Sequence, residues 1–195
     1  DTQNPLFQIN FAYHLHQNNQ IDRAIKYYKK TVEYDGRIIE ARLNLANIYT
    51  YLNKPTETLE QLIGVHKQNK NYKNINLMIS NIYITSNNYE AALPYLEDHI
   101  ETNKKDKQTL LNLSGICFRL NKWAKASQYY KLLFTNFPDE EPGNHQFLIQ
   151  SLVNLGKIET AFKELDEYIQ KHPKDKNAKL QLNKLKDIFK VKPKP

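Results

Sequence analysis

A small residue recurs along this chain at a nearly constant interval. Successive members of one series are evenly spaced, except that the last step is longer by one position: Ala24, Thr58, Ala92, Ala126 and Ala161. Pairs with a large first residue recur in step with it: Phe11-Ala12, Leu45-Ala46, Ile79-Ser80, Leu113-Ser114 and, one residue late, Leu148-Ile149. Periods of about 20–50 residues are typical of chains that stack one supersecondary unit on the next. We therefore expect an array of similar units.

Each unit is predicted to be a pair of amphipathic helices. Apolar residues recur three and four positions apart, as in Ile25-Tyr28-Val32 and Leu45-Ile48-Leu52, which is the spacing of one helix face. Polar breaks fall between the two helices: Asn18-Asn19, Asn53-Lys54-Pro55, Asn87-Asn88, Asn121-Lys122 and Gly156-Lys157. Asn and Gly tolerate the left-handed conformation that ends a helix, and Asn can cap the next one. Pro55 suits a first helical turn, whereas Pro94 should bend or loosen its helix.

The pattern resembles that of the tetratricopeptide repeat family, whose period is about 34 residues. The resemblance covers nearly the whole chain and implies an all-α, right-handed solenoid of about five helix-turn-helix repeats. The expected repeats are 5–38, 39–72, 73–106, 107–140 and 142–175. A capping helix at 176–190, with Ala178, Leu182, Leu185 and Phe189 on one face, should cover the last repeat. Residues 1–190 would form a single solenoid, and 191–195 a disordered Lys/Pro tail.

The first residues give no sign of a cap, because Leu6, Phe7 and Ile9 begin almost at once. We therefore expect a helix or further repeats upstream of Asp1. The chain as given lacks an initiator Met, so it can be a trimmed product, and the sequence assigns no compartment.

Composition excludes several classes of protein. Only 40% of the residues are hydrophobic, and no run approaches the roughly 18 apolar residues of a membrane span. Cys117 is the single cysteine, so an internal disulfide or a cysteine-based zinc site is excluded, and its core slot predicts a buried, inert thiol. We find no metal-binding helix motif, phosphate loop or nucleophile elbow. We therefore predict a protein that is not an enzyme, with no cofactor, metal or small-molecule substrate.

The net charge of +7 comes from one end of the chain. Residues 171–195 hold nine lysines and two acids, whereas residues 1–170 hold 19 basic and 19 acidic side chains. We favour a solvated outer face on the capping helix over a binding site for nucleic acid or an anionic membrane, since this region has no Arg. That binding function stays open as an alternative. Another is a self-assembling accessory subunit that docks through its uncapped first helix.

The family resemblance implies that the first helix of each repeat lines a concave groove. We call a position that recurs in the first helix of every repeat a slot. The first slot carries Asn10, Asn44, Met78, Asn112 and Phe147 in successive repeats, and the second carries Tyr13, Asn47, Asn81, Gly115 and Gln150. The third carries Gln17, Tyr51, Thr85, Arg119 and Asn154. A row of amides can donate to and accept from an extended peptide backbone, and Tyr and Arg are favoured interface anchors. The candidate site is Tyr13, Asn44, Asn47, Tyr51, Asn81, Asn112, Arg119 and Gln150. Because the chain has 22 Asn, compositional bias is the alternative explanation.

The slots differ from those of tetratricopeptide domains that clamp the carboxylate of chaperone tails. The matching positions offer amides but no Lys or Arg, so a carboxylate would lack a charge-assisted partner. We therefore expect a non-enzymatic scaffold or adaptor whose groove binds a peptide or helix of a protein partner.

Overall fold

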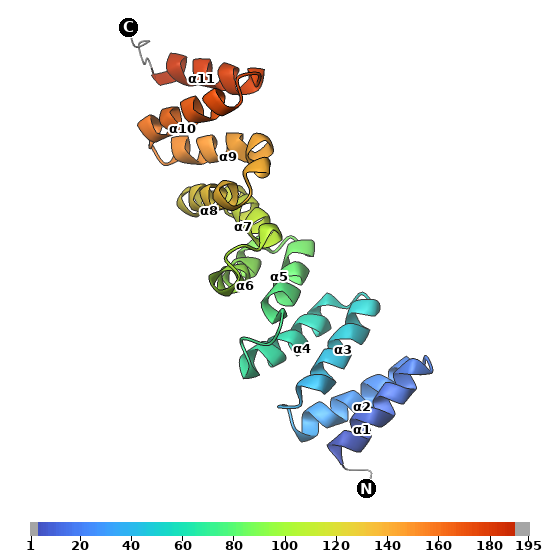
Figure 1. Ribbon diagram of the computed structural model, residues 1–195. Helices are drawn as coiled ribbons and strands as arrows, with labels where there is room; N and C mark the ends of the chain where they lie inside the picture. The colour runs from blue at the N-terminus through green and yellow to red at the C-terminus, as the bar shows by residue number, and fades with distance from the viewer. Residues whose placement is uncertain (1–3, 190–195) are drawn as a thin grey trace. The chain divides into compact units, whose positions relative to one another are not determined.

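A computed structural model describes residues 4–189, which form helices and short turns with no strand among them (Figure 1). The helices are α1 (Pro5–Gln17), α2 (Ile21–Tyr34), α3 (Ile39–Tyr51), α4 (Pro55–Gln68), α5 (Ile75–Thr85), α6 (Tyr89–Thr102), α7 (Lys107–Arg119), α8 (Trp123–Asn136), the 3₁₀ turn η1 (Pro138–Glu140), α9 (Glu141–Asn154), α10 (Ile158–Lys171) and α11 (Lys176–Phe189). The predicted all-helical fold is confirmed.

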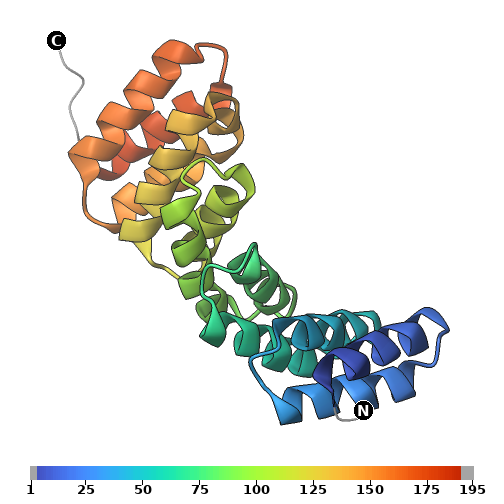
Figure 2. The same ribbon diagram turned by 60° about the horizontal axis from the view of Figure 1, so that its bottom comes forward.

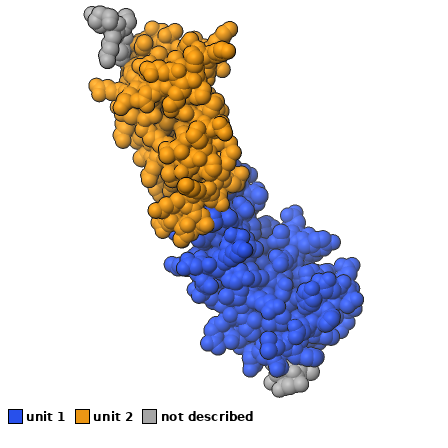
Figure 3. Space-filling view, viewed as in Figure 1, with its two compact units in different colours: residues 1–99 blue, residues 100–195 orange. Residues whose placement is uncertain are grey.

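The chain divides into two compact units, residues 1–99 and 100–195 (Figure 3). Unit 1 holds α1 to α5 and α6 as far as His99, and unit 2 holds the end of α6 and α7 to α11. The expected division of residues 1–190 into five repeats of one solenoid stays a prediction. The expected Lys/Pro tail, 191–195, lies outside the described residues.

Tight turns join the two helices of each pair, and each turn contains one residue with positive φ. These residues are Asn19, Asn53, Asn87, Asn121 and Gly156, with φ between 54° and 70°. At the first turn, the N–H of Asn19 donates to His16 O (3.0 Å) and the N–H of Gln20 to Leu15 O (2.8 Å). This pattern recurs at the other four turns and is the Schellman motif, which satisfies the last carbonyls of a helix. The predicted left-handed helix ends are confirmed.

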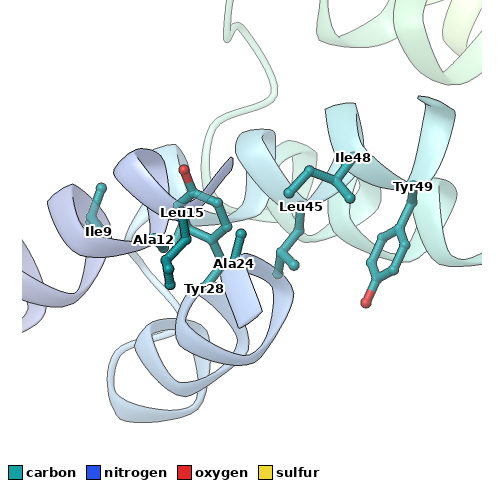
Figure 4. Close-up of a cluster of buried hydrophobic side chains, with 9 residues drawn as sticks. Ile9, Ala12, Leu15, Ala24, Tyr28, Leu45, Ile48 and Tyr49 are labelled. Atoms are coloured by element: carbon teal, nitrogen blue, oxygen red, sulfur yellow. The ribbon is translucent and has the colours of Figure 1, made fainter. Parts of the chain in front are cut away.

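Small residues allow the paired helices to approach closely. Ala24, Ala92, Ala126 and Ala161 are fully buried, and Thr58 is 2% exposed. In unit 1, Figure 4 shows Ala24 of α2 beside Ala12 and Leu15 of α1, with Tyr28 one turn further along α2. The two helices lie side by side in Figures 1 and 2. A larger side chain at these positions would push the backbones apart.

Aromatic residues connect neighbouring helix pairs in unit 2. Phe147 of α9 lies edge-on to Phe118 of α7, with centroids 5.0 Å apart, and stacks on Tyr130 of α8 at 6.0 Å. Helix α9 in turn packs on α10, and α10 on α11. Each pair of helices thus buries its apolar face against the next.

Helix α11 covers α10 with only part of its predicted apolar stripe. Ala178 and Leu185 are buried and Leu182 is half-buried, but Phe189 is 39% exposed. Leu180 and Ile188, outside the stripe, are more exposed still. The helix therefore has a second face with exposed apolar residues, which the predicted stripe did not include.

The capping of helix starts that the sequence predicted is found only at some helices. Asn88 caps α6 by accepting a hydrogen bond from the N–H of Ala91 (3.3 Å), whereas α2, α4, α8 and α10 begin without a side-chain cap. Pro55 occupies the first turn of α4 as expected. Helix α6 runs without interruption through Pro94.

Candidate partner-binding surface

The predicted site residues of unit 1 lie on the outward faces of first helices. In α3, Ala46, Ile48 and Tyr49 are buried, so the helical period turns Asn47 and Tyr51 to solvent. Tyr51 is 78% exposed, and Tyr13 of α1 is 49% exposed. Asn81 of α5 is exposed, while Asn44 of α3 is half-buried.

The asparagines of this chain fall into a structural set and an unused set. Asn19, Asn53, Asn74, Asn87 and Asn121 hold positive φ. Others bind backbone atoms: Asn4 and Asn88 cap helices, and Asn136 and Asn144 donate to carbonyls. Within the described residues, by contrast, the side chains of Asn44, Asn47 and Asn81 form no hydrogen bond. These three amides keep their full hydrogen-bonding capacity.

In unit 2 the predicted site residues lie on α7 and α9. Asn112, half-buried on α7, accepts a hydrogen bond from Gln108 Nε2 (3.2 Å). Gln150, exposed on α9, donates through Nε2 to Asn154 Oδ1 (3.1 Å). Arg119 is exposed at the last residue of α7. Neither amide caps its helix, because both contacts join side chains one turn apart on the helix surface.

A pocket of about 320 Å³ in unit 2 was not foreseen from the sequence. It lies among the first turns of α9, the end of α10 and the first half of α11. Its lining is Pro142, His145, Gln146, Tyr168, Asp175, Asn177, Ala178, Leu180, Gln181 and Lys184. The pattern of repeats gave no signal for it, because a pocket depends on how long side chains pack where α10 and α11 join.

His145 is almost fully buried in the wall of this pocket, at 3% exposed. Its ring stacks on Tyr168 with centroids 3.9 Å apart, and Tyr168 in turn contacts His172 at 4.5 Å. Burial lowers the pKa of His145 to about 4, against a smaller opposing effect of Glu164. The imidazole is therefore neutral at pH 7.

Asp175 contributes a carboxylate that the fold already uses. Oδ1 accepts the N–H groups of Asn177 (2.9 Å) and Ala178 (3.0 Å) at the start of α11, and Oδ2 accepts the Tyr168 hydroxyl (2.9 Å). The Ala178 N–H, followed by the Tyr168 hydroxyl, lowers the pKa of Asp175. Asp175 therefore acts as the cap of α11 and stays ionised at neutral pH.

Residues 4–189 contain neither a cluster of metal ligands nor a membrane-spanning helix. No three His, Cys, Asp or Glu side chains in this range gather closely enough to hold a metal ion. No helix of the same range is long and apolar enough to cross a bilayer. Cys117 is fully buried, as its core slot predicted.

Comparison with known proteins agrees with the tetratricopeptide resemblance of the sequence. Residues 77–141 match the model of the tetratricopeptide repeat. A search of curated protein sequences gives no significant match. Among solved structures, YrrB, described as a tetratricopeptide repeat protein with an unusual peptide-binding site, superposes with a TM-score of 0.61 over 94% of both chains, at 20% identity.

Two further structures have the same fold. MamA superposes with a TM-score of 0.57 over 98% of both chains, at 17% identity. A tetratricopeptide repeat protein from Parabacteroides merdae superposes with a TM-score of 0.53 over 86% of this chain and 65% of its own, at 16% identity. Residues 77–141 therefore contain tetratricopeptide repeats, and the repeat registers of the sequence and the helix pairs continue the same pattern along the described residues.

Proposed function

We propose that this protein is a non-enzymatic scaffold that binds a protein partner, as an extended segment or a helix, through the first helices of its repeats. The tetratricopeptide fold supports a protein-interaction scaffold in general. The finer proposal assigns the contact to Tyr13, Asn44, Asn47, Tyr51, Asn81, Asn112, Arg119 and Gln150, on the concave side of the repeats.

One observation carries the proposal: at matching positions of two successive first helices, the side-chain amides serve no turn, cap or core contact. Asn47 and Asn81 are exposed, occupy the same slot in successive repeats and form no hydrogen bond within the described residues. Many of the other asparagines serve turns and caps.

Aromatic and cationic residues supply anchors beside the amides. Tyr13 and Tyr51 present large exposed rings in unit 1, and Arg119 presents a guanidinium in unit 2. Tyr and Arg commonly dominate the energy of an interface because they bury much area and retain polar contacts. The peptide-binding site named for YrrB supports a peptide as the type of ligand.

The experiment is a selection from a displayed peptide library on the full chain, followed by affinity measurement on variants. Asn47→Ala, Asn81→Ala and Asn112→Ala combined should weaken the selected peptides, since each lost hydrogen bond is worth about 0.5–1.5 kcal/mol. The fold should persist, because none of the three amides fills the core.

The matched control is Gln128→Ala, an exposed amide on the second helix α8. Lys131 is a poorer control, since its ammonium pairs with Glu164 of α10. Peptides that bind the triple variant as tightly as the original chain would remove the proposal.

A further inference from the structure

The pocket of unit 2 contains polar groups that the fold leaves without partners. Within the described residues, the side chains of Gln146, Gln181 and Lys184 form no hydrogen bond or ion pair. Gln146 and Lys184 are exposed, and Gln181 is half-buried. With the exposed amide of Asn177, the pocket offers three amides and one unpaired ammonium, while its only carboxylate, Asp175, is occupied by the cap of α11.

His145 lines the same pocket with a neutral, buried ring. Its Nε2 has no hydrogen-bond partner within the described residues and is enclosed by the atoms around it. The imidazole therefore forms part of the pocket wall and adds no charge to that of Lys184.

The pocket continues the first-helix slots towards the end of the chain. Gln181 and Lys184 of α11 follow Phe147 and Gln150 of α9 by one repeat period. They therefore occupy the positions that the proposed function assigns to partner binding, and the inference below rests on that function.

Charge indicates which partner fits. Residues 171–189 carry six lysines and two acids. Of the two acids, Asp175 is engaged by α11 and Tyr168. This end of unit 2 is cationic, so it attracts acidic segments and repels basic ones.

We propose that this pocket binds an acidic side chain of a partner peptide. A Glu or Asp carboxylate pairs with Lys184 and accepts hydrogen bonds from Gln181 and Gln146. The pocket volume of about 320 Å³ accommodates one such side chain with its adjoining backbone, and Leu180 and Pro142 form apolar walls beside the aliphatic part.

The test uses the full chain and two acetylated, amidated peptides, one with four consecutive glutamates between Gly-Ser flanks and one with four glutamines. Amidation removes the terminal carboxylate as a source of charge. We expect the glutamate peptide to bind and to shift the side-chain amide resonances of Gln146 and Gln181. Lys184→Gln should weaken this binding about tenfold, as expected for loss of a charge-assisted hydrogen bond.

The matched control is Lys179→Gln, which removes an exposed lysine of the same helix outside the pocket. It changes the net charge equally, so a loss confined to Lys184→Gln reports the pocket and not general attraction. Equal losses from both substitutions, or equal binding of the two peptides, would overturn the proposal. So would single-stranded DNA that binds with the same dependence on Lys184 while the glutamate peptide does not bind.

This result is separable from that of the proposed function. If Lys184→Gln weakens glutamate binding but the triple Asn variant keeps all selected peptides, the pocket proposal is supported and the proposed amide site is refuted. If the triple variant loses its peptides while Lys184→Gln and Lys179→Gln bind the glutamate peptide equally well, the proposed amide site is supported and the pocket proposal is refuted.

Discussion

The buried imidazole of His145 should make the stability of unit 2 depend on pH. The unfolded chain has the ordinary histidine pKa of 6.5, whereas burial lowers the pKa of folded His145 to about 4. Between these values the unfolded state binds a proton that the folded state does not. Stability is therefore complete above about pH 6.5 and falls as the pH is lowered towards 4.

The size of the effect follows from the two pKa values. A change from 6.5 to about 4 corresponds to about 3 kcal/mol, because each tenfold change in proton affinity is worth about 1.4 kcal/mol. His145 is only 3% exposed, so solvent screens little of it. A loss of this size is a large part of the stability of a small domain.

The assay follows urea unfolding through the single tryptophan at several pH values from 7.5 to 4.5. Trp123 lies in unit 2, edge-on to Phe118 with centroids 5.3 Å apart, so its fluorescence reports that unit. The comparison is His145→Phe, which keeps a ring against Tyr168 but cannot titrate. Carboxyl groups and other histidines titrate in both proteins, so the difference in their pH dependence belongs to His145.

The original chain should lose up to about 2.5 kcal/mol more than the variant as the pH falls through this range, because the full difference is reached only below pH 4. Parallel curves for the two proteins would refute the reasoning, whatever their separation at pH 7.5. A titration of the His145 resonances with a midpoint near 6.5 would refute it as well.

Three substitutions test the packing and the turns. Ala126→Leu should lower the free energy of unfolding by about 1–3 kcal/mol in urea titrations, because position 126 is fully buried. Asn121 has a φ of 57°, which Gly adopts freely and a β-branched residue does not. Asn121→Gly should therefore leave the melting temperature nearly unchanged, whereas Asn121→Val should lower the free energy of unfolding by about 1–2 kcal/mol. Gly115→Ala, in open space, should raise the free energy of unfolding by about 0.5–1 kcal/mol, measured by thermal unfolding. Gly64→Ala should gain less in the same measurement, because its Cβ would lie 2.6 Å from Arg42 Nη1 and the guanidinium must shift.

Periodic spacing in the sequence predicted the features that every repeat needs. A helix crossing has room only for a small residue, and a Schellman turn needs a residue that tolerates positive φ. These steric demands return once in every repeat, so Ala24 and Ala126, or Asn53 and Asn121, could be located before the structure was known. The helical fold follows from such positions.

Features that occur once were not predictable from spacing. The pocket depends on how His145 stacks on Tyr168 and on how Asp175 caps α11, and no other described repeat has this combination. The exposure of Phe189 and Leu180 likewise depends on the angle at which α11 meets α10. For the predicted site, the sequence indicated which slots hold polar residues. Only the structure shows which of their amides form no hydrogen bond within the described residues.

The most direct test of the scaffold function is the side-chain amide spectrum of the ¹⁵N-labelled chain, recorded with and without a selected peptide. The resonances of the slot residues Asn47 and Asn81 should shift or broaden, because their amides are the proposed contacts. Those of the turn residues Asn53 and Asn121, which hold the left-handed helix ends, should stay in place. Shifts confined to the turn asparagines or to Gln128 of α8, with Asn47 and Asn81 unchanged, would contradict the account.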